Sequence, residues 1–447
     1  MSFQDELEPK VAEIDRLARE MYDLYLGVFG LKGGEDGQLV EDPDEFAAVA
    51  DFSMEEEQEK YAEFLSFLDD VKARFEKYYD LDPLDLTILT YSLGGHGGGA
   101  VASPVPSTVH GRIQYADDTW MRPVLEMITE EDWSGGAALT FRDDFVAPFH
   151  RAALQQMACT SILAMGAQAF HDAVTSIQDD LLEIADAGIA RLSGDYGGGG
   201  SGGFFTVVSF IAGAVGLFLP TGASQVAGVI SLGSGVASVF AGIDDSDERR
   251  EWTISGVNAP MILESIWDNL LELDEIIAGK DEQMADGLEQ DLDSPTAFSS
   301  ADLRLPEPTG LDSDGFGDLT VDTVVAGVPI SENKVVVSIV SLYEAGYRNL
   351  PYAAYQYEQA VAELVEPLPG TLSRHFYRSR LAFQLARARL RVAVSGIRWH
   401  LTNSGEALVQ IATDYELTDE RGAEVLRQIG EIHPPILSDP VGPGGYY

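Results

Sequence analysis

The chain has 447 residues, with 74 Asp and Glu against 28 Lys and Arg and a formal net charge of -46. A surface this negative repels phosphate backbones, which excludes nucleic acid as a partner. The hydrophobic content of 45% is ample for the packed core of two or three domains, which excludes an acidic disordered protein.

The negative charge has two explanations. One is a halophilic cytoplasm, and the other is a secreted or surface protein that its charge keeps soluble. The first residues, MSFQDELEPK, lack the basic start and apolar run of a secretory signal peptide. We therefore expect that the protein either stays in the cytoplasm or leaves by a route that reads no cleaved signal peptide. The single cysteine, Cys159, allows no disulfide within the chain and is expected to be a buried core thiol.

Two amphipathic helices are predicted in the N-terminal helical region, residues 1–92. Apolar side chains recur at alternating spacings of three and four over 1–30 and again over 54–80, which is the period of a helix with one buried face. A linker rich in Gly, Pro and Ser follows at 93–111.

Helical spacing also dominates the rest of the chain, with no alternation of strands and helices. The remaining regions are, in order, a Trp-x-Gly helical region at 112–195, a Gly-rich run and apolar hairpin at 196–243, a helix that completes the bundle at 244–290, an acidic loop at 291–331, a C-terminal helical hairpin at 332–430 and a flexible tail at 431–447. The predicted fold is all-α: an elongated helical bundle of long antiparallel helices with a central apolar helical hairpin.

An uncharged stretch lies in the middle of this acidic chain. From Tyr196 to Ile243 there is no Asp, Glu, Lys, Arg or His, and two apolar arms, 204–219 and 226–243, flank the turn-like PTGASQ. Each arm is shorter than the roughly 20 residues of a membrane-spanning helix. The hairpin either enters a membrane or packs against the bundle, and we favour packing in the soluble state with insertion as a conditional step. Its candidate membrane residues are Phe204, Phe205, Phe210, Phe218, Leu219, Val226, Ile230 and Phe240.

A basic stretch occurs near the C-terminus. Between Thr371 and Gly405 there is no acidic residue, although several arginines occur there. These arginines either pair with acidic helices of the same chain, which we favour, or attract an anionic lipid surface or an acidic partner. The candidate basic face consists of Arg374, Arg378, Arg387 and Arg391.

The sequence contains no recognisable enzyme motif. It has no Walker A pattern, no HExxH, no GxSxG, and no GxGxxG between a strand and a helix. The seven histidines are scattered, and acidic pairs are expected on solvated faces in a chain of this composition. We therefore predict a non-enzymatic protein with no catalytic, cofactor-binding or metal-binding residues and no cofactor.

Two short motifs resemble those of a known family. Trp133-Ser134-Gly135 lies in a break between predicted helices, and Tyr415 and Asp419 stand four residues apart at the end of the last predicted helix, on one face. The pair is similar to the Trp-x-Gly turn and the Tyr-x-x-x-Asp/Glu export signal of the WXG family of type VII (ESX) secretion substrates. In that family the two motifs meet at one end of a four-helix bundle. The resemblance covers about 112–192 and 332–430.

The resemblance implies a folded substrate of a type VII secretion system, with Trp133, Gly135, Tyr415 and Asp419 as its export signal. Such a protein is secreted or held in the cell envelope without a cleaved signal peptide, and its partners are a secretion-system ATPase or chaperone. The alternative is a helical-bundle pore-forming protein that inserts 204–243 into membrane lipids, with a homo-oligomer as the expected assembly. A halophilic cytoplasmic protein with a buried hairpin is a third possibility.

Overall fold

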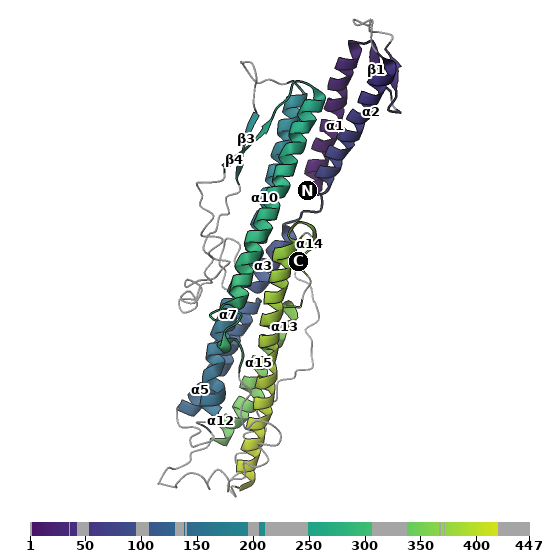
Figure 1. The fold of residues 1–447 in the computed structure, drawn as a ribbon. Coiled ribbons are helices and arrows are strands. Elements are labelled where there is room, and N and C mark those ends of the chain that lie inside the picture. Colours follow the sequence, from purple (N-terminus) through teal and green to yellow (C-terminus); the bar gives the residue numbers. More distant parts are fainter. Residues whose placement is uncertain are drawn as a thin grey trace.

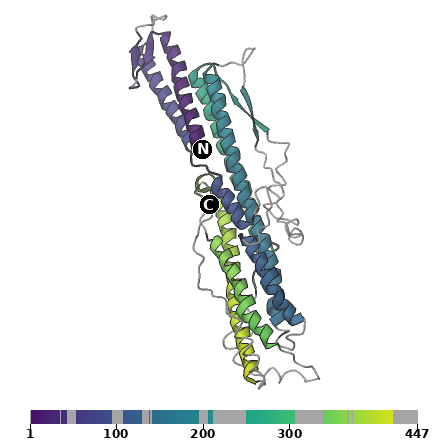
Figure 2. The same cartoon turned by 180° about the vertical axis from the view of Figure 1, so that it is seen from behind.

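The fold comes from a computed structural model, which describes residues 2–34, 36–42, 53–94, 107–129, 138, 141–194, 205–210, 249–305, 338–365, 368–370 and 372–418. The all-α prediction is confirmed. Within these ranges, long helices form the body of the protein and the strands form two antiparallel ladders of two strands each. Figures 1 and 2 show the helices lying side by side along one long direction.

Helix α7 (Ala147–Leu192) is the longest of the described helices, and most of its residues are buried. Residues 156–164 are buried at every position, so here the helix has no solvent-exposed face. Its small side chains, including Ala158 and Ala167, let neighbouring helices approach closely. Helices α1 and α3 contact α7, as do α4, α10 and α15. The long helix predicted from Leu154 to Leu192 is confirmed, and it begins one to two turns earlier than expected.

Helix α10 (Ala259–Asp293) runs antiparallel to α7. A Cβ atom built at Gly188 would lie 2.7 Å from Ile266 Cδ1, and one built at Gly166 would lie 3.7 Å from Leu288 Cδ2, so residue numbers rise along one helix as they fall along the other. Asn258 caps the N-terminus of α10 by accepting a hydrogen bond from the Met261 backbone N–H.

The N-terminal region is an antiparallel helix pair closed by a small ladder. It contains α1 (Phe3–Gly27), β1 (Leu31–Gly33), β2 (Leu39–Glu41) and α2 (Met54–Glu76). Both predicted helices are therefore confirmed. Their faces meet through aromatic side chains, and the rings of Tyr22 and Phe64 stack with centroids 4.2 Å apart.

Short helices connect this pair to the rest of the bundle. They are α3 (Leu84–Leu93), α4 (Val109–Tyr115) and α5 (Arg122–Thr129), and a separate 3-10 turn, η3 (Ala301–Leu303), follows α10 and contacts α7. A π-helical turn, η1 (Ala116–Met121), lies between α4 and α5, and a second one, η2 (Arg142–Val146), precedes α7.

The C-terminal region is a helical hairpin. Its first arm contains α12 (Ile339–Glu344), the π-helical turn η5 (Ala345–Asn349) and α13 (Leu350–Glu363), and its second arm is α15 (Tyr377–Thr418), preceded by the single turn α14 (Leu372–His375). Pro351 lies in the first turn of α13, directly after the π-helical turn η5. The arms touch where Gly346 and Gly405 bring their backbones together.

The prediction of a helical hairpin at 204–243 is wrong for the first residues of this segment. Residues Phe205–Phe210 form the strand β3, which pairs antiparallel with β4 (Arg249–Ile254). The β3 sequence FTVVSF is rich in aromatic and β-branched residues, which favour strands over helices. Phe205 and Phe210 belong to β3, whereas Phe204, Phe218, Leu219, Val226, Ile230 and Phe240 lie outside the described residues.

Replacing Gly346 with Ala tests the contact between the two arms of the C-terminal hairpin. The new Cβ would lie 2.8 Å from the Gly405 carbonyl oxygen and 3.1 Å from the Val409 backbone nitrogen, neither of which is a flexible side chain. We expect the variant to lose about 1–3 kcal/mol of unfolding free energy in urea denaturation.

The control is Gly279→Ala in α10, where the added Cβ would meet no atom within 4 Å. This substitution should raise the unfolding free energy by about 0.5–1 kcal/mol, because Ala favours a helix over Gly. Equal effects of the two substitutions would contradict the close approach of the arms.

Candidate functional site

The β3–β4 ladder is attached to the bundle through a buried tryptophan. Trp252 of β4 is 1% exposed, and its indole Nε1–H donates a hydrogen bond of 3.0 Å to Asp180 Oδ1 of α7. Ile254, two residues further along the strand, is also buried, as the alternation of side chains in a strand requires. The inner face of β4 is therefore part of the core of the protein.

Further hydrogen bonds hold the end of β4 between α7 and α10. The Thr253 carbonyl accepts hydrogen bonds from Ser265 Oγ at 3.3 Å and Asn269 Nδ2 at 3.2 Å, both on α10. The Arg191 guanidinium of α7 donates to the Gly256 carbonyl at 2.6 and 2.9 Å. Strand β4 is thus hydrogen-bonded to α7, which precedes it in the sequence, and to α10, which follows it.

The register of the ladder brings the two ends of the uncharged stretch together. Phe205 is paired with Ile254, and the last pair is Phe210 with Arg249. Residues 211–248, which include most of the uncharged stretch, therefore leave and re-enter the described structure at neighbouring positions on two paired strands. The ladder is the base of this segment.

A group of carboxylates lies on α7 next to this base. Burial, together with the negative charges of Asp180, Asp179 and Asp186, raises the pKa of Glu183 to about 7. Glu183 thus holds a proton in the folded protein at a pH where an ordinary glutamate has lost it. Protonation of Glu183 therefore changes the charge about one helical turn from Asp180, which accepts the hydrogen bond from Trp252.

The opposite end of α7 is surrounded by three π-helical turns. The turns η1, η2 and η5 all contact α5. Such turns insert an extra residue into a helix and occur frequently at functional sites. Asp117 of η1 is buried, and His150 Nδ1 of α7 lies 2.7 Å from its Oδ2. Trp120 of η1 stacks on Tyr352 of α13 with ring centroids 4.6 Å apart.

The elements that flank the two family-like motifs approach each other at this end. Trp133 and Gly135 lie outside the described residues, between α5 and η2. Tyr415 belongs to the last turn of α15, its side chain is not among those described, and Asp419 lies just beyond the described part. Figure 1 shows α5, α12 and the end of α15 at the same end of the molecule.

Described contacts link these flanking elements. Helix α5 contacts η5, and η5 and α12 contact α15. Tyr343 Oη of α12 lies 3.1 Å from Thr413 Oγ1, two residues before Tyr415. The Arg348 guanidinium of η5 lies 5.9 Å from the centroid of the Trp120 ring. The end of α15 and the helix before Trp133 are therefore separated by one layer of protein.

The candidate basic face is largely paired within the chain. Arg378 Nη1 lies 3.0 Å from Glu282 Oε1 and Nη2 lies 3.3 Å from Asp286 Oδ1, both on α10. Arg374 lies 3.5 Å from Asp80, and the buried Arg387 donates to the Glu363 carbonyl at 3.1 Å. Arg391 is exposed, with no ion pair to the described residues. Two of the four arginines, Arg374 and Arg378, thus form ion pairs within the chain, and Arg387 is held by a backbone carbonyl.

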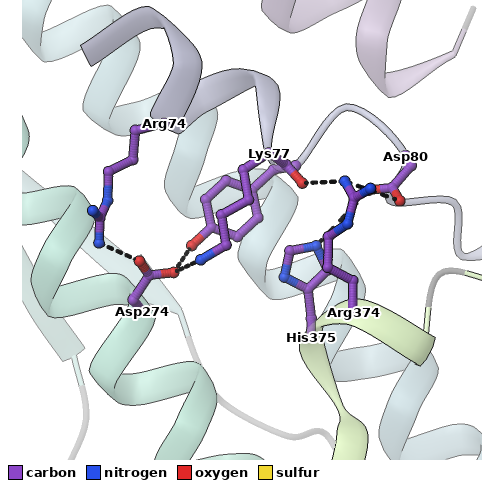
Figure 3. A network of polar contacts seen from close by, with 7 residues as sticks. Arg74, Lys77, Asp80, Asp274, Arg374 and His375 are labelled. Carbon is purple, nitrogen blue, oxygen red and sulfur yellow. Dashed lines mark hydrogen bonds and ion pairs between the residues drawn. The ribbon is translucent and has the colours of Figure 1, made fainter. Parts of the chain in front are cut away.

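Figure 3 shows a polar junction that joins three distant segments. Asp274 of α10 accepts hydrogen bonds from Arg74, Lys77 and Tyr78. Burial opposes the charge of Asp274, but the hydrogen bonds from Lys77 and Tyr78 and the nearby positive charges hold its pKa below the usual value.

The C-terminal region contributes α14 to the same junction. The His375 ring stacks on Tyr78 with centroids 5.0 Å apart, and burial lowers the pKa of His375. His375 Nε2 lies 3.8 Å from Asp80 Oδ1. The Asp274 carboxylate thus receives three hydrogen bonds from the residues around the end of α2, which is typical of a structural contact between segments.

The sequence did not reveal the ladder base or the π-helical turns. The alternation of Trp252 and Ile254 was the available signal for β4, and it is hidden in the charged run DDSDERREW. The π-helical turns have no sequence signature, because they follow from packing between neighbouring helices.

Comparison of the chain with models of protein families, with curated proteins and with solved structures returned no match. Among the helices of the described residues, none is long and apolar enough to cross a membrane.

Replacing Trp252 with Ala tests the anchor of the ladder. We expect a loss of about 3–5 kcal/mol of unfolding free energy, because a large buried side chain and its hydrogen bond disappear. Hydrogen exchange at 205–210 and 249–254 should accelerate more than exchange in the α1–α2 pair. Leu84→Ala is the control, since Leu84 is 61% exposed and its loss should change stability by less than about 1 kcal/mol. Unchanged ladder exchange in the Trp252 variant would contradict the anchor.

Replacing Glu183 with Gln tests the carboxylate group on α7. The folded pKa of about 7 exceeds the ordinary value of 4.5, so the folded state binds more protons between these pH values, and its stability falls as the pH rises through this window. The variant should lose this part of the pH dependence and be more stable than the wild type at pH 8. Denaturation midpoints at pH 5, 6 and 8 measure the effect. An identical pH profile for wild type and variant would contradict it, and Glu289→Gln, at an exposed position of α10, is the control.

Proposed function

We propose that the protein is a non-enzymatic substrate of a type VII secretion system, exported in its folded state. The observation that supports this most directly is that α5, which precedes the Trp-x-Gly motif, and the last turns of α15, which carry Tyr415, approach the same end of the bundle. In the WXG family, the two motifs meet at one end of a helical bundle. A composite export signal requires the same proximity.

Each motif would be supplied by a different part of this chain. Helices α4 and α5 lead to Trp133 and Gly135, and the hairpin of α12, α13 and α15 leads to Tyr415 and Asp419. Contacts of α4 and η1 with α13 join the two parts within one molecule. A single chain would thus provide both halves of the signal, which small family members contribute from separate hairpins.

The export signal is tested by secretion of variants from a strain that contains a type VII system. Tyr415→Ala, Asp419→Ala and Trp133→Ala should each reduce the protein in the culture medium at least about tenfold while the cytoplasmic pool remains folded. The control Tyr91→Ala removes a 54% exposed tyrosine far from the motifs, and the control Asp82→Ala changes a second Tyr-x-x-x-Asp pair of the sequence, Tyr78 and Asp82. Secretion of the motif variants at the wild-type level would refute the proposal.

A second proposed function is disturbance of lipid membranes by the uncharged segment. It is favoured by the register of the ladder, which brings Phe210 and Arg249, the residues that flank 211–248, together on strands attached to α7 and α10. A segment with no charge between Tyr196 and Ile243 can enter a lipid bilayer without the cost of burying an ionised group. The two functions are compatible, because an exported protein can act on a membrane.

Leakage of dye from zwitterionic liposomes tests the second function. The informative variant replaces 211–248 with Asn-Gly, a two-residue turn that joins Phe210 to Arg249 and preserves the ladder. The wild type should release the dye, and this variant should not. Absence of both leakage and liposome binding in the wild type would exclude the membrane function and leave the export proposal unaffected.

A further inference from the structure

The outer face of α15 carries an exposed apolar stripe. Its members are large side chains that are 44–59% exposed although they belong to a helix whose other face is in the core; they are Tyr377, Leu381, Leu385, Val392 and Trp399. They are separated by four or seven residues, so they lie along one side of the helix. We call these five residues the α15 stripe.

The size of the α15 stripe is that of an interface. It extends over about 33 Å, given the rise of 1.5 Å per residue in a helix. With aromatic side chains of about 150–250 Å² each, half exposure of the five residues presents on the order of 500 Å² of apolar surface. This is at the upper end of the largest patch on a typical monomer, about 300–600 Å². Standard interfaces bury about 800 Å² per partner, of which somewhat more than half is apolar.

Arginines on both borders of the stripe are paired within the chain, and Arg391 is exposed with no ion pair to the described residues. On one side Arg378 pairs with Glu282 and Asp286 of α10. On the other side Arg398 lies 3.3 Å from Glu358 of α13. An acidic partner helix would therefore find few unpaired cations here. A second copy would meet an acid-free helix face, between Thr371 and Gly405, where repulsion between two chains of net charge -46 is weakest.

The spacing along the stripe also suits a second copy. Leu381, Leu385, Ala388, Val392, Ser395 and Trp399 follow one another at spacings of four and three, as core positions of a two-stranded coiled coil do. When two such helices are antiparallel, Leu385 meets Ser395 of the second copy and Ala388 meets Val392 of the second copy. Leu385 and Val392 then face small residues, Leu381 meets Trp399 of the second copy, and both copies use the same surface, as a twofold axis requires.

We propose that the α15 stripe is the interface of a homodimer in which two copies of α15 pack antiparallel. The dimer joins the molecules along their C-terminal hairpins and leaves the β3–β4 ladder, on the other long helices, outside the interface. Because the interface is apolar and the chains repel each other, high salt strengthens the dimer by screening the repulsion.

Sedimentation velocity tests the proposal on the full chain over a range of concentrations. It is measured at about 0.15 M and about 1 M salt, where charges are screened over about 8 Å and about 3 Å. The wild type should form dimers with a lower dissociation constant at high salt. The double variant Leu385→Gln, Val392→Gln should raise this constant at least about tenfold, while circular dichroism stays unchanged because both side chains are exposed.

The control is the double variant Leu84→Gln, Ile88→Gln, which removes two equally exposed apolar side chains from α3 and should dimerise like the wild type. A wild type that stays monomeric, a dimer unaffected by the α15 variant, or a dimer weakened by salt would each overturn the proposal. The proposal would also be overturned if the wild type is monomeric and the α15 variant only loses binding to lipid vesicles. That result would assign the stripe to a membrane surface.

Cysteine cross-linking tests the antiparallel arrangement. The double variant Ala388→Cys, Val392→Cys should form a covalent dimer under mild oxidation, because residue 388 of one copy lies beside residue 392 of the other. Cys159 does not interfere, since it is buried in α7. A covalent dimer formed as rapidly by Ala388→Cys alone would require a parallel arrangement and would overturn this one.

Discussion

The structure depends on one helix, α7, whose residues 156–164 are buried at every position. A stretch without a solvent face must be covered by neighbours, and α7 contacts α1, α3, α4, α10 and α15. Small residues set how closely the neighbours approach, as at Gly188, where Ile266 and Ile14 both lie within 4 Å of a built Cβ. The two ends of α7 then carry the two candidate sites, the ladder base and the group of π-helical turns around α5.

Arginines of the C-terminal region interrupt the acidic surface of the protein. Three arginines of the C-terminal region are bound within the chain: Arg378 and Arg398 form ion pairs with α10 and α13, and Arg387 donates to the Glu363 carbonyl at the end of α13. The carboxylates that they neutralise would otherwise repel one another across helix contacts. The basic stretch thus makes it possible for acidic helices to pack in a chain with a net charge of -46.

The long amphipathic helices were predictable from the sequence, because the period of their apolar residues is set by local geometry. This holds for α1, α2, α7 and α10, whose buried positions include the predicted ones, such as Ile262 and Leu270. The strand β4 was not predictable, since its assignment depends on the pairing of Trp252 with Asp180, far away on α7. Nor could the sequence reveal the π-helical turns, which arise where α5 packs against three different segments.

The central claim is that the end of α15 and the helix before the Trp-x-Gly motif share one end of the protein. Distances between spin labels at the exposed positions Glu126 and Gln410 test it directly, with Glu126 and Tyr377 as the reference pair. Cys159 should escape labelling, because its burial raises its pKa to about 12. Residues 377 and 410 are about 50 Å apart along α15. The account predicts that the first distance is shorter than the second by tens of ångströms, and equal distances or the reverse order would contradict it.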